Sequence, residues 1–171
     1  MITILTACGR YGEIGQSGEL PWHIPEDMEF FKRITKNHVV IMGYKTWLSL
    51  PKRPLKGRIN IVITKEHLDE FYLNKDSSVV GVNSLAGAIS FACNYYSNKQ
   101  IFIIGGGQIY DLAVKYNVAN RIIVTHVDAE YPDADTFFPL SQIEDKYLYS
   151  VSLEYNEEQP SYSRKIYRLK I

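Results

Sequence analysis

The sequence predicts an α/β fold, with one domain over residues 1–171, a mainly parallel eight-stranded sheet, an antiparallel hairpin at its C-terminal edge and about four flanking helices. Short runs rich in Val, Ile and Tyr alternate with helical stretches, which favours strands joined by helices. Runs such as VVIM and IFII are apolar throughout, as expected for strands buried on both faces. The last two runs flank Asn156–Pro160 with no intervening helix, so they predict the edge hairpin.

Each element follows from its own residue pattern. The helix at Pro25 begins with a proline followed by Glu26 and Asp27, residue types that favour the N-terminal end of a helix. Runs rich in Val, Ile and Tyr predict strands, in chain order, at Ile2–Ala7, Val39–Met42, Ile59–Thr64, Ser78–Val82, Gln100–Ile104, Arg121–Val127, Tyr147–Tyr155 and Ser161–Lys170. Helical stretches are expected at Pro25–Lys36, Lys45–Leu50, Ser84–Ser97 and Gln108–Tyr116.

Composition narrows the class of protein. With 171 residues, 46% of them hydrophobic, the chain can bury one substantial core. Lys plus Arg and Asp plus Glu number 19 each, which gives no sign of a nucleic-acid-binding surface. No apolar run is long enough to span a bilayer, and the N-terminal segment lacks the basic region of a signal peptide. We therefore expect a cytoplasmic monomer that binds neither nucleic acid nor membranes.

The two cysteines, Cys8 and Cys93, have no CxxC or histidine spacing. We expect both to be buried free thiols rather than a disulfide or a metal site. No metal site is expected elsewhere.

A single carboxylate, Asp27, falls in the middle of the apolar face of the Pro25–Lys36 helix. At about 100° per residue, Asp27 lines up with Phe31 and Ile34, and no Lys or Arg of this helix shares that face. A carboxylate on an apolar face is costly unless it is protonated or meets a cation or hydrogen-bond donors. A ligand with such donors would meet that need, although a first-turn acidic residue is also explained in part by the helix dipole.

Two strand exits have the features of phosphate-binding turns. The run Val39–Met42 leads into Gly43-Tyr44-Lys45-Thr46 and then a helix, and Gln100–Ile104 leads into Gly105-Gly106-Gly107 and then a helix. Glycines allow close approach of the backbone, and free amides at a helix N-terminus attract anions. Each turn alone also fits an ordinary strand-to-helix connection, but the pair favours a nucleotide with several phosphates. The GxGxxG fingerprint of a Rossmann domain is absent.

An ordered series of motifs runs through nearly the whole chain. Its members are Ile14-Gly15, Leu20-Pro21-Trp22-His23-Ile24-Pro25-Glu26-Asp27, Phe31-Lys32, Val40-Ile41-Met42-Gly43, Thr46-Trp47, Arg53-Pro54-Leu55, Gly57-Arg58-Ile59-Asn60, Ile103-Ile104-Gly105-Gly106-Gly107-Gln108-Ile109-Tyr110, Thr125-His126-Val127 and Asp135-Thr136-Phe137-Phe138-Pro139. In this content and order the chain closely resembles the dihydrofolate reductase family. The segments Glu66–Ser78 and Gln142–Asp145 carry little of the resemblance.

The resemblance implies an NADPH-dependent enzyme that reduces 7,8-dihydrofolate to 5,6,7,8-tetrahydrofolate for one-carbon and thymidylate metabolism. Asp27 is then expected to accept the adjacent N–H and amino group of the pterin edge, with Thr125 orienting the carboxylate or a bridging water. A carboxylate that clamps this edge cannot easily reach the nitrogen that takes the proton. Water near Leu20 and Trp22 is therefore the expected immediate proton donor.

The same pose assigns the remaining substrate contacts. Apolar side chains are expected to form a slot for the pterin and aryl rings, although each could equally be core. Arg58 is expected to fork onto the α-carboxylate of the substrate's glutamate, and Lys32 to add a weaker attraction. The expected substrate-binding residues are Leu5, Ala7, Asp27, Met28, Phe31, Lys32, Leu50, Arg53, Leu55, Arg58, Ile104, Tyr110 and Thr125.

The resemblance also implies a site for NADPH, with Ala7 and Ile14 beside the nicotinamide. Tyr44 stands where the family often has Arg, so Lys45 remains as a cation for the 2′-phosphate, while Tyr44 could stack on adenine. The glycine-rich segment Gly9–Ile24 is expected to be a mobile lid over both rings. The expected cofactor-binding residues are Ala7, Ile14, Gly15, Gly43, Tyr44, Lys45, Thr46, Ile63, Thr64, Lys65, Ile104, Gly105, Gly106, Gly107, Gln108, Ile109, Tyr110 and Thr136.

Two other functions fit parts of this pattern. A riboflavin-pathway reductase on the same fold would share the phosphate turns but not the Pro-Trp segment with Asp27. A non-catalytic folate-binding or structural relative would have lost Asp27, Trp22 or the paired glycines, and this chain keeps all of them.

Overall fold

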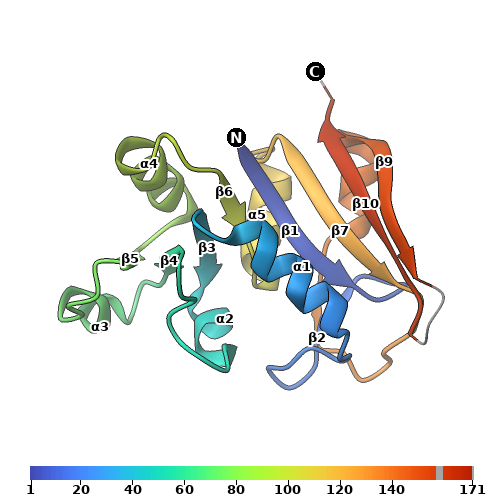
Figure 1. The fold of residues 1–171 in the computed structure, drawn as a ribbon, viewed down its shortest axis with the longest axis horizontal. Coiled ribbons are helices and arrows are strands. Elements are labelled where there is room, and N and C mark those ends of the chain that lie inside the picture. The colour runs from blue at the N-terminus through green and yellow to red at the C-terminus, as the bar shows by residue number, and fades with distance from the viewer. Residues whose placement is uncertain (157–159, 171) are drawn as a thin grey trace.

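The computed structural model describes residues 1–156 and 160–170, with the side chains of 152–156 left out. Figure 1 shows a central sheet with helices packed against it. The strands are β1 (Ile2–Cys8), β2 (Glu13–Gly15), β3 (Val39–Gly43), β4 (Ile59–Ile63), β5 (Val79–Val82), β6 (Ile101–Ile103), β7 (Arg121–Val127), β8 (Thr136–Phe137), β9 (Tyr147–Asn156) and β10 (Tyr162–Leu169). The helices are α1 (Pro25–Thr35), α2 (Tyr44–Ser49), α3 (Leu68–Tyr72), α4 (Leu85–Tyr95), α5 (Gly107–Lys115) and α6 (Leu140–Lys146).

Eight strands form the sheet, in the order β5–β4–β3–β6–β1–β7–β10–β9. All pairs from β5 to β7 are parallel, and β10 is antiparallel to both β7 and β9. The predicted mainly parallel sheet with an antiparallel edge hairpin is confirmed. Part of the segment predicted to connect the hairpin strands, residues 157–159, lies outside the described residues.

The number of helices corrects the sequence-based expectation, since the described residues contain six rather than about four. The four predicted helices are present, with their ends within two residues of the expected positions. The two missed helices, α3 and α6, have only five and seven residues. Such short helices do not display the repeated 3.6-residue pattern on which the prediction rests. The sequence also gave no sign of the small second sheet formed by β2 and β8.

Alternate residues of the central strands belong to two separate hydrophobic clusters, one on each face of the sheet. Along β3, Val39 and Ile41 belong to one cluster, and Val40 and Met42 to the other. This alternation is the direct consequence of side chains pointing to opposite faces along a strand. Strands with two buried faces explain why their sequences are apolar throughout rather than alternating.

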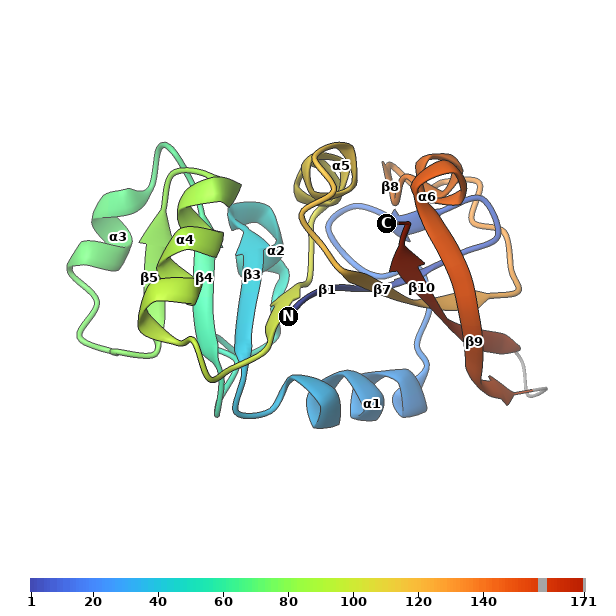
Figure 2. The same cartoon turned by 90° about the horizontal axis from the view of Figure 1, so that it is seen from above.

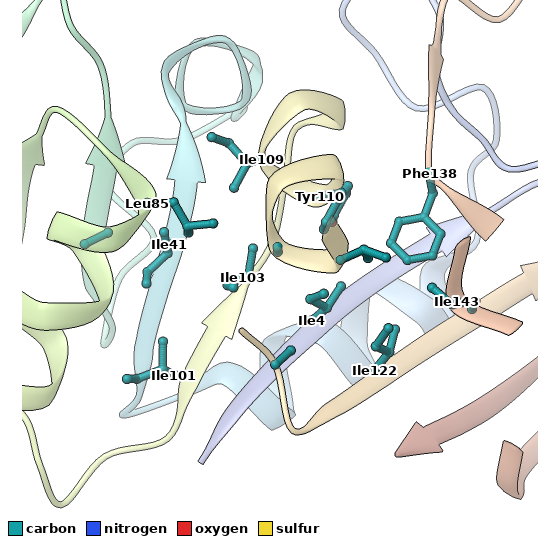
Figure 3. Close-up of a cluster of buried hydrophobic side chains, with 14 of the residues drawn as sticks. Ile4, Ile41, Leu85, Ile101, Ile103, Ile109, Tyr110, Ile122, Phe138 and Ile143 are labelled. Atoms are coloured by element: carbon teal, nitrogen blue, oxygen red, sulfur yellow. The ribbon is translucent and has the colours of Figure 1, made fainter. Parts of the chain in front are cut away.

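Helices cover both faces of the sheet. The cluster in Figure 3 joins the strands to α4, α5 and α6 through side chains such as Leu85, Ile109 and Ile143. On the other face, Phe30, Phe31 and Ile34 of α1 pack against a cluster that includes Trp47 of α2 and Phe71 of α3. Figure 2 shows α1 on the opposite side of the sheet from α5 and α6. This layering brings Asp27 over the strands rather than toward solvent.

The carboxyl ends of β3, β6, β1 and β7 lie next to one another. Residue Ala7 pairs with Thr125 across β1 and β7, and the glycine turns follow β3 and β6. Ligands in open α/β sheets bind at this edge. Among the described residues, no helix has the length and apolar character needed to cross a membrane.

Candidate active site

Three elements distant in sequence supply one hydrogen-bonded cluster around Asp27. The hydroxyl Oγ1 of Thr125 on β7 donates to Asp27 Oδ1 at 2.6 Å. Arg164 Nη2 on β10 donates to the same oxygen at 2.8 Å, forming an ion pair. Arg164 Nε also donates to Thr125 Oγ1 at 3.1 Å. Each of the three side chains therefore contacts the other two.

The strand register explains why these side chains meet. Arg164 and Thr125 are directly paired across β10 and β7, so they share one face of the sheet, the face that α1 covers. The Arg164 side chain is 0% exposed, and its guanidinium carbon lies 3.7 Å from the centroid of the Phe30 ring. A cation packed on an aromatic face and paired with a carboxylate satisfies the main requirements for burying a charge.

Sequence reasoning missed Arg164, although a signal was present. Alternate residues of a strand share a face, and Tyr162 and Ile166 are both buried hydrophobics on either side of Arg164. The period-2 pattern therefore points Arg164 into the protein. The expectation that no cation on α1 shares the face of Asp27 is correct, but the cation comes from β10 instead.

Asp27 keeps one oxygen available. Both of the hydrogen bonds described for it end on Oδ1, and among the side chains and backbone groups that the structure describes, none donates to Oδ2. The side chain is 16% exposed, so it can be reached from solvent. A partly buried carboxylate with a fixed orientation and a free oxygen can bind hydrogen-bond donors of a ligand.

The expected apolar slot is assembled mainly on the α1 face of the sheet. Five of the expected residues contribute to the same hydrophobic cluster as Phe30: Leu5, Phe31, Leu50, Leu55 and Ile104. Met28, on α1, is 48% exposed, so its side chain is accessible to a ligand.

Leu20 and Trp22, which are expected near the proton donor, differ in how they are packed. Trp22 packs against Tyr131, with ring centroids 5.2 Å apart, in a small cluster that includes Ile24. Leu20 is 50% exposed. The cluster with Trp22 also contains Val127, which places it near the carboxyl end of β7.

The two expected arginines and Lys32 differ in how firmly they are held. Arg58 Nη1 donates to Thr35 Oγ1 at 3.2 Å, and the guanidinium lies 5.9 Å from the centroid of the Phe31 ring. Partial burial lowers the pKa of Arg58. Arg53 is exposed and lies over Trp47, whereas Lys32 is exposed on α1. Arg58 is therefore the best-oriented cation near the slot.

The two glycine turns contact each other through backbone atoms. Gly43 N donates to Gly105 O at 2.7 Å, and the Gly105–Gly106 peptide is cis. A Cβ on Gly106 would come within 3.0 Å of Thr46 Oγ1, and one on Gly43 within 3.3 Å of Ile109. Gly105 has φ +128°, a conformation that favours glycine. The turns are thus closely packed cradles that any side chain would fill.

Other expected cofactor residues surround these turns. Tyr110 is buried and donates to Leu5 O at 2.9 Å, and its ring lies 3.5 Å from where a Gly105 Cβ would be. A Cβ on Gly107 would lie 2.9 Å from Thr136 Cγ2. The remaining members are Ala7 near the end of β1, Ile14 and Gly15 in β2, Ile63, Thr64 and Lys65 at and after the end of β4, Ile104 after β6, and Gln108 in the first turn of α5.

Tyr44 is already stacked within the protein. Its ring is parallel to that of His67, with centroids 4.1 Å apart and an interplanar angle of 14°. Its hydroxyl donates to Glu70 Oε1 at 2.7 Å, which raises the pKa of Tyr44. Lys45 is exposed, as is Lys65. Thr64 is buried and accepts from the backbone N–H of His67.

The Gly9–Ile24 segment is anchored at several points. Its β2 strand pairs with β8, and Ser17 N donates to Asp135 Oδ2 at 2.7 Å. This bond, the Thr136 hydroxyl and the charge of Lys45 hold the pKa of Asp135 below its usual range. The carboxylate of Glu13 is buried and accepts from Tyr11 N and Tyr131 N. Motion of the segment as a lid stays a prediction.

The cysteine expectation is half correct. Cys8 is a buried free thiol, and burial raises its pKa to about 12. Cys93 is free but exposed. The buried face of α4 contains Ala88 and Ala92, and Cys93 lies outside that face. Within the described part of the chain, no group of His, Cys, Asp or Glu side chains is arranged to hold a metal ion.

Comparison with known proteins places the whole chain in one family. A family model described as dihydrofolate reductase matches residues 1–170. The dihydrofolate reductase of Mycobacterium tuberculosis (strain ATCC 25618 / H37Rv) is 38% identical over 134 residues, which cover 77% of this chain and 74% of the relative. That of Neisseria meningitidis serogroup B is 38% identical over 138 residues, which cover 81% of this chain and 78% of the relative.

A plant relative is much longer. The bifunctional dihydrofolate reductase-thymidylate synthase of Daucus carota is 38% identical over 149 residues, which cover 80% of this chain but only 28% of the relative. The matches make this chain an oxidoreductase that reduces dihydrofolate with NADPH, and they do not favour a non-catalytic folate-binding relative. The chain belongs to the dihydrofolate reductase family.

Proposed function

We propose that Asp27 binds the pterin edge of dihydrofolate and that the Thr125 hydroxyl fixes the orientation of its carboxylate. The observation that carries this assignment is the Asp27 cluster, in which Oδ1 accepts from Thr125 and Arg164 while Oδ2 has no partner among the described residues. The pterin edge offers an N–H beside an amino group, a donor pair that matches a carboxylate. Asp27 then orients and polarises the ring.

Water is the immediate proton donor in this proposal. The nitrogen that takes the proton lies away from the edge that Asp27 holds, so the carboxylate does not transfer a proton to it directly. Leu20 is exposed and Trp22 packs nearby on Tyr131, which supports a water position between the lid segment and the ring. Asp27 acts on that proton transfer through the charge distribution of the ring.

The apolar slot and the arginines bind the rest of the substrate. Leu5, Phe31, Leu50, Leu55 and Ile104 share one cluster, which supports a continuous apolar surface for the pterin and aryl rings. Arg58 is assigned to the glutamate α-carboxylate, because its hydrogen bond to Thr35 and its contact with Phe31 hold the guanidinium at the end of the slot. Met28, Lys32 and Arg53 border the same substrate.

The glycine turns fit the cofactor. Gly43, Gly105 and Gly106 form a cradle that a Cβ would fill, which is the feature expected where backbone must approach a nicotinamide and its phosphates. When bound, NADPH supplies the hydride. Ala7, Ile14 and Tyr110 are assigned to exclude water around the nicotinamide, and Thr46 and Gly107 to the phosphate side.

The remaining cofactor residues are assigned to the adenosine end. Lys45 is the cation for the 2′-phosphate, with Thr64 and Lys65 beside it, and Tyr44 with its stacked His67 forms the surface for adenine. We further propose one domain over residues 1–171, a monomer, a cytoplasmic location and no nucleic-acid partner. The balanced charge of 19 basic and 19 acidic residues supports the lack of a nucleic-acid partner, and the use of the apolar helix faces by the two clusters supports the monomer.

Loss of NADPH absorbance on adding dihydrofolate tests the proposal, with Asp27→Asn measured beside the wild type. Turnover should fall at least about a hundredfold in the variant, because the amide removes the anion that polarises the ring. NADPH affinity should stay within about twofold, since Asp27 does not contact the glycine turns. Equal losses of turnover and NADPH binding would refute the assigned role.

A further inference from the structure

We propose that the buried guanidinium of Arg164 selects the charge of the heterocycle that binds at Asp27, favouring neutral rings over cationic ones. The inference rests on the proposed binding of a heterocycle edge by Asp27. It assigns to Arg164 a specificity-determining role that involves no direct step in hydride or proton transfer.

The ion pair weakens the attraction of Asp27 for a cationic ligand. Arg164 Nη2 lies 2.8 Å from Asp27 Oδ1, so a positive charge stands directly beside the carboxylate. Asp27 has no second ionic partner among the described residues. For a neutral ring, the charge of Arg164 changes the Coulomb energy of binding little. A cationic ring gains from an isolated anion but is repelled by a nearby guanidinium.

The position of Arg164 prevents the guanidinium from moving away easily. The side chain is 0% exposed, it donates from Nε to Thr125 Oγ1, and its guanidinium carbon is 3.7 Å from the Phe30 ring centroid. Its backbone is fixed by pairing with Thr125 in β7 and with β9 on the other side. The positive charge is therefore a permanent part of the site rather than a mobile surface group.

The acceptor geometry of Asp27 adds to this selection. A carboxylate oxygen has two lone-pair directions, and Thr125 and Arg164 together use both of those on Oδ1. Oδ2 keeps its two acceptor directions. A ligand must therefore place its strongest donor at Oδ2 and share Oδ1 with Arg164. A neutral N–H that shares Oδ1 with the Arg164 guanidinium is repelled little, whereas an N–H of a cationic ring is repelled strongly.

The experiment compares two bicyclic probes with the same shape. The neutral probe, 2-amino-4-quinazolinone, presents a ring N–H beside an amino group. The cationic probe, 2,4-diaminoquinazoline, presents the same pair only when its ring nitrogen is protonated. Dissociation constants are measured by quenching of tryptophan fluorescence for the wild type, Arg164→Met and Arg164→Lys, with NADPH binding as a check on folding.

The ratio of the two affinities is the decisive readout, because general damage to the site weakens both probes alike. We expect Arg164→Met to shift the ratio by about 10- to 100-fold toward the diamino compound, as the repulsion is removed. Arg164→Lys keeps a positive charge and should restore most of the wild-type preference. An unchanged ratio in Arg164→Met overturns the inference.

The wild type alone gives a second test that does not depend on a variant folding. At a pH where free 2,4-diaminoquinazoline is mostly neutral, its ultraviolet spectrum reports whether the bound form carries a proton. We expect the spectrum of the neutral form, or no binding. A cation spectrum in the wild type overturns the inference.

One further variant separates this inference from the proposed function. If Asp27→Asn binds the neutral probe as tightly as the wild type does, Asp27 does not hold the heterocycle and both proposals fail. If the neutral probe depends on Asp27 but the affinity ratio does not depend on Arg164, only the charge selection fails.

Discussion

The two ends of the proposed ligand site differ in the atoms that form them: backbone atoms at one end and side-chain atoms at the other. At the glycine turns after β3 and β6, backbone atoms make the contacts, as in the bond from Gly43 N to Gly105 O. Around Asp27, three side chains from α1, β7 and β10 make them. The first end is sensitive to any added Cβ, whereas the second is sensitive to the identity of individual polar groups. Substitutions at each end should therefore fail in different ways.

Among substitutions that keep Asp27, the largest effect on activity is expected from removing the hydroxyl at the centre of the side-chain cluster. Thr125→Val keeps the shape of the side chain but removes the hydroxyl that bonds to both Asp27 and Arg164. Hydrogen bonds to charged groups contribute about 1.5–3 kcal/mol, so kcat/KM for dihydrofolate should fall about 10- to 100-fold. Steady-state kinetics measure this loss.

A matched control exists on the neighbouring strand. Thr3 on β1 is also buried, and its Oγ1 accepts from Arg121 Nε at 3.2 Å. Thr3→Val should lower the free energy of unfolding by a similar amount without reducing kcat/KM beyond the loss of folded protein. Equal kinetic losses in the two variants would show that the Thr125 hydroxyl acts only on stability.

A second prediction concerns charge on the same strand, one residue from Thr125. Burial, with a smaller contribution from Lys165, lowers the pKa of His126 from 6.5 to about 4, and its Nε2 lies 2.9 Å from the Tyr167 hydroxyl. The unfolded chain therefore binds a proton at a pH where the folded chain does not. Stability is fully present above about pH 6.5 and is lost as the pH falls toward 4.

The expected loss is about 2 kcal/mol over this window, after allowance for the partial exposure of the ring. Urea unfolding at pH 7.5, 6 and 4.5 measures it, with His126→Gln as the variant that cannot titrate. The difference in pH dependence between the two proteins isolates the histidine. Parallel pH profiles would contradict the prediction.

The third prediction sharpens the contrast at the backbone end. In Gly106→Ala the new methyl group would lie 3.0 Å from Thr46 Oγ1, tighter than ordinary contact, so either the Thr46 side chain or the turn has to move. NADPH affinity should fall about tenfold, or about 1.4 kcal/mol, with a smaller change in dihydrofolate binding. Gly87→Ala on α4 brings a methyl equally close to Ser84 Oγ and should leave NADPH binding unchanged.

The smallest effect is expected for the exposed cation at the same end. Lys45→Ala should weaken NADPH by about 1 kcal/mol and leave NADH unaffected, because only NADPH carries the 2′-phosphate. Titration of both cofactors by fluorescence measures the preference, with the exposed Lys52→Ala as the control. A preference that does not change would remove Lys45 from the phosphate site.

The contact between the two glycine turns was easier to predict from the sequence than the cluster around Asp27. Glycines at two strand exits carry a local signal, and a parallel sheet brings adjacent exits together, so neither long-range contact nor side-chain detail was needed. The parallel strands of the main sheet were predictable from their apolar runs, and the antiparallel pair β9–β10 from the lack of a helix between its two runs. The short helices α3 and α6 carry too few residues for a periodic signal.

Arg164 shows why the side-chain end was only partly predicted. The helical pattern of α1 identified Asp27 as a carboxylate on an apolar face that requires a cation or a hydrogen-bond donor. This pattern gives no information on which strand packs against that face. Thr125 entered through the family resemblance alone. Only the pairing of β7 with β10 shows that Arg164 and Thr125 face the same helix. Cross-strand register depends on the whole sheet, and local patterns do not determine it.

Asp27 and Arg164 are joined by a hydrogen bond across 137 positions of the chain. During synthesis, β3, β6 and both glycine turns leave the ribosome well before β10 does. A nascent chain halted ahead of Arg164 would contain α1 with its carboxylate but would lack the cation that fixes it. The glycine turns are thus synthesised early, and the cluster around Asp27 is completed only when β10 pairs with β7.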